Sequence, residues 1–235
     1  MEQYAYLAGC AILFTLFWLP LYLYRRETRP AMLLMSAFAA PLGPLTTLFY
    51  WHDYWMPLYA VPALTGLEDF IFSFLIGGVA GAAYSVAFGL SAPGPRPRGK
   101  RWWAAGLALA GMLVLYVGTL LGFNSMYVSY ALLGVLAFIL IAYRPRLIVP
   151  ALFGAVATAA AMLVMYQVWF YLFPSTVLWW NLGALSGTLI SGVPIEELYW
   201  GAAWGFFAGA GFEFVAQSRY ILTNGPPAHK GREVS

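Results

Sequence analysis

Two long stretches of the chain contain no charged residue, and they limit the possible folds more than any other feature. Residues 102–143 and 147–195 lack Asp, Glu, Lys and Arg entirely. A bilayer core about 30 Å thick needs roughly 20 apolar residues per helix. Of the 235 residues, 62% are hydrophobic and 9% are charged, whereas soluble domains carry about 25% charged residues. The sequence predicts a polytopic membrane protein and argues against a soluble enzyme, a disordered chain or a nucleic-acid binder.

The pattern predicts an all-α fold with about seven transmembrane helices. The N-terminal segment has no basic n-region, so we interpret it as the start of the first span and not as a cleaved signal. The single Cys10 excludes an internal disulfide and a cysteine metal cluster. The expected spans lie near 4–24, 31–50, 67–90, 103–121, 126–143, 147–171 and 194–217.

The basic residues predict how the chain is oriented in the membrane. With seven spans, all twelve Lys and Arg residues fall on one side, and the positive-inside rule makes that side cytoplasmic. We therefore expect a multi-pass protein of the cell (inner) membrane, with the N-terminus outside and the C-terminus in the cytoplasm. The basic residues form four groups: Arg25, Arg26 and Arg29; Arg96, Arg98, Lys100 and Arg101; Arg144 and Arg146; Arg219, Lys230 and Arg232.

The two halves of the chain resemble each other. The acidic pair Glu68-Asp69 has a counterpart in Glu196-Glu197, and the small residues after each pair match at a constant offset of 128. Each pair also follows a Trp-containing segment, and the counts from Asp53 to Glu68 and from Asn181 to Glu196 are both 15. The matching small residues are Gly77, Ala80, Gly81 and Ala82 against Gly205, Ala208, Gly209 and Ala210.

This duplication predicts two parallel three-helix repeats joined by a linker helix, a 3+1+3 arrangement. The first repeat would occupy residues 1–90 and the second 126–217. A basic, Pro- and Gly-rich cytoplasmic linker with the linker helix would occupy 91–125, and a cytoplasmic tail 218–235.

Five acidic residues lie on the side that lacks Lys and Arg, and they are the candidate catalytic residues: Asp53, Glu68, Asp69, Glu196 and Glu197. An acid at membrane depth is a functional hypothesis by default. The alternative is helix capping, because Thr65 to Glu68 fits a capping box and Pro194 before two acids suits a helix start. Capping explains one acid per helix better than two.

The charge-free segment 172–193 is expected to fold back over these acids and exclude water, and segment 51–66 is expected to do the same for the other half. Burial favours the protonated form of a carboxyl, which would allow one acid to act as a general acid. Nearby aromatic residues form either an interfacial belt or a cage that stabilises a carbocation. The candidate substrate-binding residues are Trp51, Trp55, Phe72, Trp179, Trp180, Asn181, Tyr199, Trp200 and Trp204.

The run Pro194-Ile195-Glu196-Glu197 resembles the PxE[ED] signature of the membrane-integral lycopene cyclase domains, which occur as separate subunits or as fused repeats. Glu68-Asp69 stands at the matching position of the first half, with Gly66 in place of the proline. Asp53 also resembles that family's pattern, and Asn181 stands in its place in the second half. The likeness covers nearly the whole chain through its length, duplication and acid placement.

The resemblance implies a carotenoid cyclase that closes ionone-type end rings with no net redox change. A carboxylic acid would protonate a terminal double bond, and a carboxylate would later remove a proton. One acid of the first pair and one acid of the second pair would divide the acid and base roles between them, or each pair would serve one end of the substrate. No cofactor is expected. The expected partners are a lipid-soluble polyene from the bilayer, membrane lipids and other enzymes of the carotenoid pathway, with no nucleic acid.

Several other functions stay open or are excluded by the sequence. A membrane terpene cyclase that acts on another isoprenoid would use the same residues. A small-solute transporter shares the 3+1+3 arrangement but needs more polar groups at the midplane. A rhodopsin-like photoreceptor needs a lysine in the last helix, which is absent. His52, Asp53 and Glu68 supply too few ligands for a convincing metal site.

Overall fold

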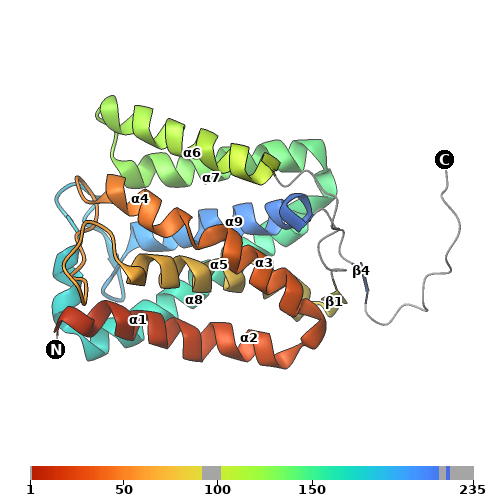
Figure 1. The fold of residues 1–235 in the computed structure, drawn as a ribbon, viewed down its shortest axis with the longest axis horizontal. Helices are drawn as coiled ribbons and strands as arrows, with labels where there is room; N and C mark the ends of the chain where they lie inside the picture. The colour runs from red at the N-terminus through yellow and green to blue at the C-terminus, as the bar shows by residue number, and fades with distance from the viewer. Residues whose placement is uncertain (1, 92–101, 217–220, 223–235) are drawn as a thin grey trace, which may run out of the picture.

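The computed structural model describes residues 2–91, 102–216 and 221–222. In this part of the chain the helices run along a common axis and form one bundle, with the connecting segments at its two ends (Figure 1). Five of the twelve basic residues lie in this part, and the other seven lie outside the described residues.

The elements follow the order expected from the sequence. The strands are the short pairs β1 (Leu90–Ser91) with β4 (Ile221–Leu222) and β2 (Leu189–Ile190) with β3 (Val193–Pro194), both antiparallel. The helical elements are η1 (Glu2–Tyr4), α1 (Ala5–Leu13), η2 (Phe14–Trp18), α2 (Leu19–Tyr24), η3 (Arg26–Thr28), α3 (Arg29–Ala39), α4 (Leu42–Tyr50), α5 (Leu67–Ala87), α6 (Trp102–Leu120), α7 (Ser125–Tyr143), η4 (Pro145–Leu147), α8 (Ile148–Leu172), η5 (Pro174–Trp179) and α9 (Ile195–Ala216).

Prolines account for the breaks in the first two spans. Pro20 has no N–H to donate to the preceding turn, and a π-helical turn, η2, precedes it. Pro41 and Pro44 lie where α3 gives way to α4. Despite these interruptions, α1 with α2 and α3 with α4 each form one continuous rod in Figure 1.

Five helices of the described part are long and apolar enough to cross a membrane. They agree with five of the seven expected spans to within a few residues, except that the second begins at Arg26 and not at residue 31. The other two expected spans correspond to α6 and α9, which are not among the five; α6 contributes a shorter apolar helix, Ala108–Leu120. The five are Glu2–Tyr24, Arg26–Tyr50, Leu67–Ala87, Ser125–Tyr143 and Pro145–Leu172.

Glycines bring the central helices α5 and α9 close to their neighbours. A Cβ added to Gly77 of α5 would lie 2.8 Å from the carbonyl oxygen of Met35 on α3. A Cβ added to Gly205 of α9 would lie 2.1 Å from the carbonyl oxygen of Gly154 on α8. Small residues allow such close backbone contact between membrane helices. Gly77 and Gly205, which match at an offset of 128, therefore each allow close contact with the backbone of a neighbouring helix.

Two loops cover one end of the bundle and bind to each other. We call them the first acidic-end loop (51–66) and the second acidic-end loop (173–194). Trp55 and Trp180 form an antiparallel β-bridge. The N–H of Met56 donates to the carbonyl of Trp179, and the N–H of Asn181 donates to the carbonyl of Tyr54, both at 2.9 Å. The two loops thus form one continuous cover.

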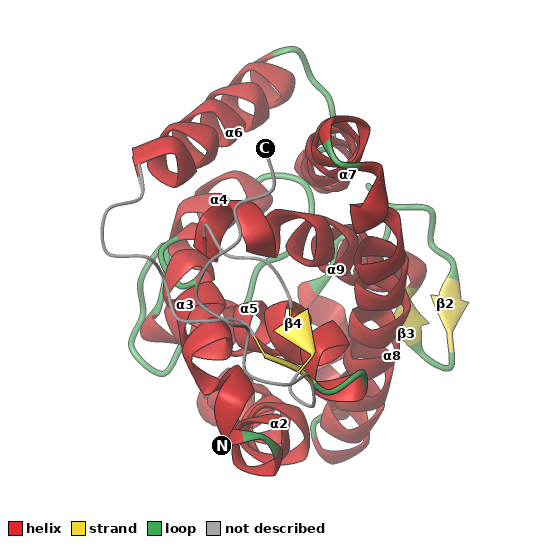
Figure 2. Ribbon diagram, turned by 90° about the vertical axis from the view of Figure 1, so that its right-hand side faces the viewer, coloured by secondary structure: helices red, strands yellow, loops and turns green. Residues whose placement is uncertain are grey.

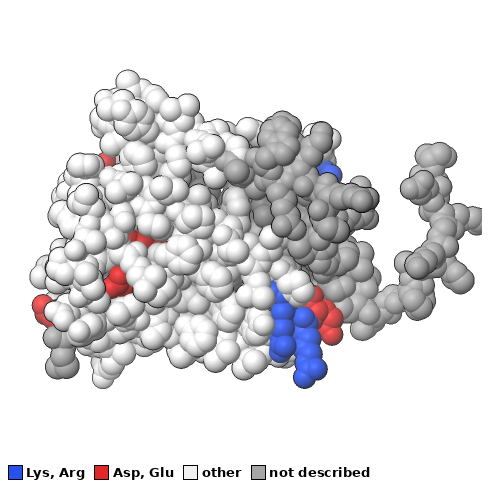
Figure 3. Space-filling model, viewed as in Figure 1, with Lys and Arg blue, Asp and Glu red and all other residues white. Residues whose placement is uncertain are grey.

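Charge separates along the bundle axis. The described basic residues lie in the turns after the first span and before α8, all at one end, and Figure 3 shows the blue side chains only there. The five candidate acids lie at the opposite end, in the acidic-end loops and the first turns of α5 and α9. The five described basic residues and the five candidate acids therefore lie at opposite ends of the bundle.

Asp53 connects the first acidic-end loop to the start of α7. Its Oδ2 accepts a hydrogen bond from the Ser125 N–H at 2.7 Å, and its Oδ1 accepts one from the Ser125 hydroxyl. Asn124 caps the same helix through the N–H of Met126, and it donates from Nδ2 to the carbonyl of Asp53 at 3.0 Å. A carboxylate at a helix N-terminus is stabilising, so Asp53 anchors α7 to the other half of the chain.

We expect Asp53→Ala to destabilise the fold, because it removes both acceptors from the start of α7. The cost should be about 1–2 kcal/mol, the range for loss of an N-terminal cap, measured as a lower unfolding temperature of the detergent-solubilised protein. His52→Ala, at the exposed neighbouring position, is the matched control. Equal unfolding temperatures for the two variants would contradict this role of Asp53.

Candidate active site

Four carboxyl groups are buried in the first turns of α5 and α9. Glu68, Asp69, Glu196 and Glu197 are each only 1–3% exposed. Burying a carboxylate is costly unless hydrogen bonds or ion pairs compensate it. Among the described residues no Lys or Arg lies at this end, so the compensation comes from hydrogen-bond donors.

Asp69 accepts three hydrogen bonds from three different segments. The Tyr6 hydroxyl on α1 donates to Oδ1 at 3.0 Å, while the Tyr59 hydroxyl and the Gly66 N–H donate to Oδ2 at 2.7 and 2.9 Å. Burial and the neighbouring Asp69 carboxylate raise the pKa of Tyr59, so its hydroxyl keeps the proton that it donates.

The predicted capping box at Thr65 is wrong by one residue. The helix begins at Leu67 with Gly66 as the N-cap, and Asp69, three residues after that cap, accepts the Gly66 N–H. Glycine has no side chain with which to complete the box, so only half of the reciprocal pair forms. Asp69 therefore caps α5 with one oxygen and accepts the Tyr6 hydroxyl with the other.

Glu197 is bound in a similar way by side chains of the second half. The Tyr166 hydroxyl on α8 donates to Oε2 at 2.5 Å, and Trp180 Nε1 of the second acidic-end loop donates to Oε1 at 2.6 Å. Each carboxyl oxygen of Glu197 therefore accepts a hydrogen bond from a different aromatic side chain.

The first acid of each pair binds backbone groups of the loops. Oε1 of Glu68 accepts the Ala60 N–H at 2.8 Å. Oε1 of Glu196 accepts the Ser186 N–H at 2.7 Å, with the Tyr127 hydroxyl at 3.4 Å. Glu68 and Glu196 thus fasten the acidic-end loops to the helices, one in each half.

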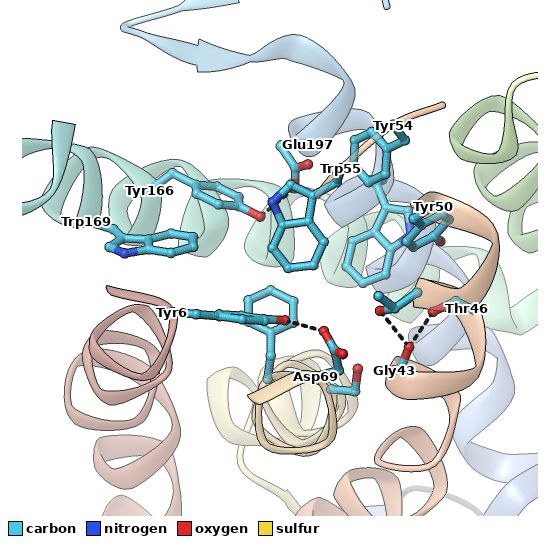
Figure 4. Close-up of a pocket in the computed structure, with 14 residues that line it drawn as sticks. Tyr6, Gly43, Thr46, Tyr50, Tyr54, Trp55, Asp69, Tyr166, Trp169 and Glu197 are labelled. Carbon is cyan, nitrogen blue, oxygen red and sulfur yellow. Dashed lines mark hydrogen bonds between the residues drawn. The ribbon is translucent and has the colours of Figure 1, made fainter. Parts of the chain in front are cut away.

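The second acid of each pair lines one shared cavity. Asp69 and Tyr6 face Glu197 and Tyr166 across it, as Figure 4 shows. The cavity encloses about 490 Å³ of space not filled by atoms, counting the space at its mouth. It is lined by Tyr6, Gly43, Thr46, Thr47, Tyr50, Tyr54, Trp55, Asp69, Phe72, Ser73, Tyr166, Trp169, Glu197 and Trp200. We call it the acid cavity.

Aromatic rings form most of the wall of the acid cavity. Tyr6 lies edge-to-face with Trp55, with ring centroids 5.0 Å apart, and stacks on Trp169 at 6.0 Å. Trp169 also stacks on Tyr166. Ring faces attract a positive charge placed over them. A cavity with two carboxyl groups and an aromatic wall can donate a proton, stabilise a cation and accept a proton.

The structure separates the candidate site residues into distinct positions. Of the five candidate catalytic acids, Asp69 and Glu197 line the acid cavity, Glu68 and Glu196 bind loop backbone, and Asp53 binds Ser125. No group of three His, Cys, Asp or Glu residues in the described ranges is arranged to hold a metal ion.

The candidate substrate-binding residues also occupy several different positions. Trp55, Phe72 and Trp200 line the acid cavity, while Trp204 lines a neighbouring cavity. Trp180 binds Glu197, and Trp179 packs edge-to-face on Trp169. The other three candidates also lie outside the acid cavity: Tyr199 is 53% exposed, Asn181 binds loop backbone, and Trp51 is half-buried.

Sequence reasoning missed the tyrosines that bind the acids. Tyr6 lies 63 residues before Asp69, and Tyr166 lies 31 residues before Glu197. Their position in the spans is the signal that could have identified them. In the predicted topology both tyrosines lie at the same end of the bundle as the acids, and a buried carboxylate there needs a hydrogen-bond donor.

Comparison with known proteins supplies independent evidence. Residues 124–215 match the family model described as lycopene cyclase. No curated protein and no solved structure gives a significant match to the chain. The matched segment contains α7, α8 and nearly all of α9, and with them Tyr166, Glu196 and Glu197. Over residues 124–215 the chain is therefore similar to the lycopene cyclase family.

Proposed function

We propose that the protein is a carotenoid cyclase that closes rings at the ends of a lycopene-type polyene. One observation carries the proposal: the second acid of each duplicated pair, Asp69 and Glu197, lines the same aromatic-walled cavity. The lycopene cyclase family match supports the substrate class. The reaction is an internal rearrangement of bonds, so the enzyme would be an isomerase or intramolecular lyase.

The reaction needs one proton donor and one proton acceptor. A carboxylic acid adds a proton to the terminal C=C bond and leaves a tertiary carbocation. A neighbouring C=C bond attacks that carbon and closes a six-membered ring, which moves the positive charge to a ring carbon. A carboxylate removes a proton beside that carbon, and a new C=C bond forms. One proton enters and one leaves, with no net redox change.

The hydrogen bonds suggest how the roles divide. Asp69 and Glu197 both lie in the first turn of a helix, but Asp69 accepts three hydrogen bonds whereas Glu197 accepts two. Each hydrogen bond donated to a carboxylate stabilises its ionised form. We assign Glu197 as the general acid and Asp69 as the general base.

The aromatic wall supports the cationic intermediate. Cation–π attraction is stronger when both partners are desolvated. Tyr6 contacts both Trp55 and Trp169 in the wall of the acid cavity (Figure 4). The buried cavity also limits water, which would otherwise capture the cation.

We further propose that the chain is a fused duplication in a seven-span, 3+1+3 arrangement. The first span, α3–α4 and α5 would correspond to α7, α8 and α9, and α6 would be the unpaired linker. Matched glycine contacts of α5 on α3 and of α9 on α8 support this correspondence. By the positive-inside rule, the basic end would face the cytoplasm and the acid cavity the opposite side of the cell membrane.

A cell that accumulates lycopene provides the test of substrate and product. We expect its pigment to shift from lycopene to ring-containing carotenoids when the chain is produced there, measured by chromatography of extracted pigments. Unchanged lycopene, in cells whose membranes contain the protein, would contradict the assignment. New rings on another isoprenoid would favour the related terpene cyclase.

Substitution of the acids tests the division of roles. We expect Glu197→Gln and Asp69→Asn each to lower the rate of ring formation by about 100-fold or more, the usual contribution of a general acid or base. Glu68→Gln and Glu196→Gln are matched controls, because an amide oxygen still accepts the backbone N–H. Wild-type rates in the first two variants, or equal losses in all four, would overturn the assignment.

A further inference from the structure

A second cavity adjoins the acid cavity. The two share five lining residues, Gly43, Thr46, Tyr50, Ser73 and Trp200. Tyr50 and Trp200 therefore lie where the two spaces meet. Beyond them the second cavity runs between α4, α7 and α9 and reaches α6, and its further lining is mostly apolar: Leu42, Ile76, Met112, Leu132, Leu133 and Trp204.

Helix α6 forms the outer wall of this second cavity. It packs against α7 and α4, and Figure 2 shows it at the edge of the bundle, beside these two helices. Met112 of α6 lines the cavity, whereas Leu109, Leu113 and Leu120 are 61–71% exposed. One side of α6 thus closes the space between α4 and α7, and its other side presents apolar residues to the surroundings of the bundle.

We propose that the second cavity binds the polyene chain of the substrate while one end group lies in the acid cavity, with α6 as the wall toward the bilayer. This inference rests on the proposed function. A lycopene-type polyene is several times longer than one end group, so most of its length must lie outside the acid cavity. The second cavity adjoins the acid cavity, with which it shares five lining residues, and its mostly apolar further lining suits a hydrocarbon chain.

The proposal gives a specificity role to residues with no part in the proton transfers. Met112 and Leu132 would contact the chain, and Tyr50 and Trp200 would hold it at the passage between the cavities. Enlarging the side chains in the second cavity should therefore block a long substrate without altering the carboxyl groups.

The experiment measures how much lycopene the purified protein retains. The Glu197→Gln background, which the proposed mechanism predicts to be inactive, is purified from lycopene-accumulating cells, and bound pigment is read from its absorbance per protein. Adding Met112→Trp or Leu132→Trp should lower the retained lycopene by about tenfold or more, because overpacking fills the cavity. In the Glu197-containing protein the same substitutions should slow ring formation.

Leu113→Trp is the matched control, since it adds the same side chain to the exposed side of α6. It should retain lycopene like the background protein. The inference is overturned if the background retains no lycopene, or if both cavity variants retain as much as Leu113→Trp. If Met112→Trp or Leu132→Trp does not elute as folded protein in size-exclusion chromatography, Leu133→Phe, which enlarges another residue of the second cavity, takes its place. If the wild-type chain forms no rings but the cavity variants still lose bound lycopene, the proposed function is overturned. The second cavity would still be supported as the site that binds the polyene chain.

Discussion

The buried carboxyl groups at the acidic end have no described Lys or Arg nearby, and the need to satisfy them with hydrogen bonds organises this end of the molecule. An unpaired carboxylate in an apolar bundle costs several kcal/mol or takes up a proton. Each of the four acids in the first turns of α5 and α9 is therefore met by donors from elsewhere in the chain. Asp69 is met by Tyr6 of α1 and Glu197 by Tyr166 of α8, while backbone groups of the two acidic-end loops bind Glu68 and Glu196. The cover, the helix arrangement and the cavity are parts of one hydrogen-bonded assembly.

The duplicated acids differ enough to serve different roles. Asp69 accepts three hydrogen bonds, one of them from the N-terminus of its own helix, and Glu197 accepts two from aromatic side chains. The Asp53 carboxylate anchors α7, whereas at the corresponding place it is the backbone N–H of Asn181 that donates to the carbonyl of Tyr54. Because Asp69 and Glu197 line one cavity, a donor and an acceptor in a single site explain the geometry better than two equivalent sites.

Much of the fold could be predicted from the sequence, because the spans depend on local properties. Charge-free runs and basic turns gave helix positions within a few residues of those observed for α5, α7 and α8. The acids could be identified because few charges exist and these recur at an offset of 128. The lycopene cyclase resemblance drawn from Pro194 to Glu197 is confirmed by the family match over residues 124–215.

The arrangement of the site could not be predicted, because it depends on tertiary contacts. Adjacent residues on a helix point about 100° apart, and sequence alone does not tell which of Glu68 and Asp69 lines the acid cavity. The same rotation leaves Tyr199 exposed while Trp200 and Trp204 line cavities. Tyr6 and Tyr59 could not be paired with Asp69 before the first helix and the first acidic-end loop were placed against α5.

Solvent deuterium tests the central claim, that a carboxyl proton of the acid cavity starts ring closure. Lycopene is incubated with the membrane-embedded protein in D2O, and the products are analysed by mass spectrometry. We expect one deuterium in each ring formed, because an exchangeable carboxyl group supplies the entering atom, and no labelled rings from Glu197→Gln. Rings formed without deuterium, or labelled rings formed at the wild-type rate by Glu197→Gln, would contradict this claim.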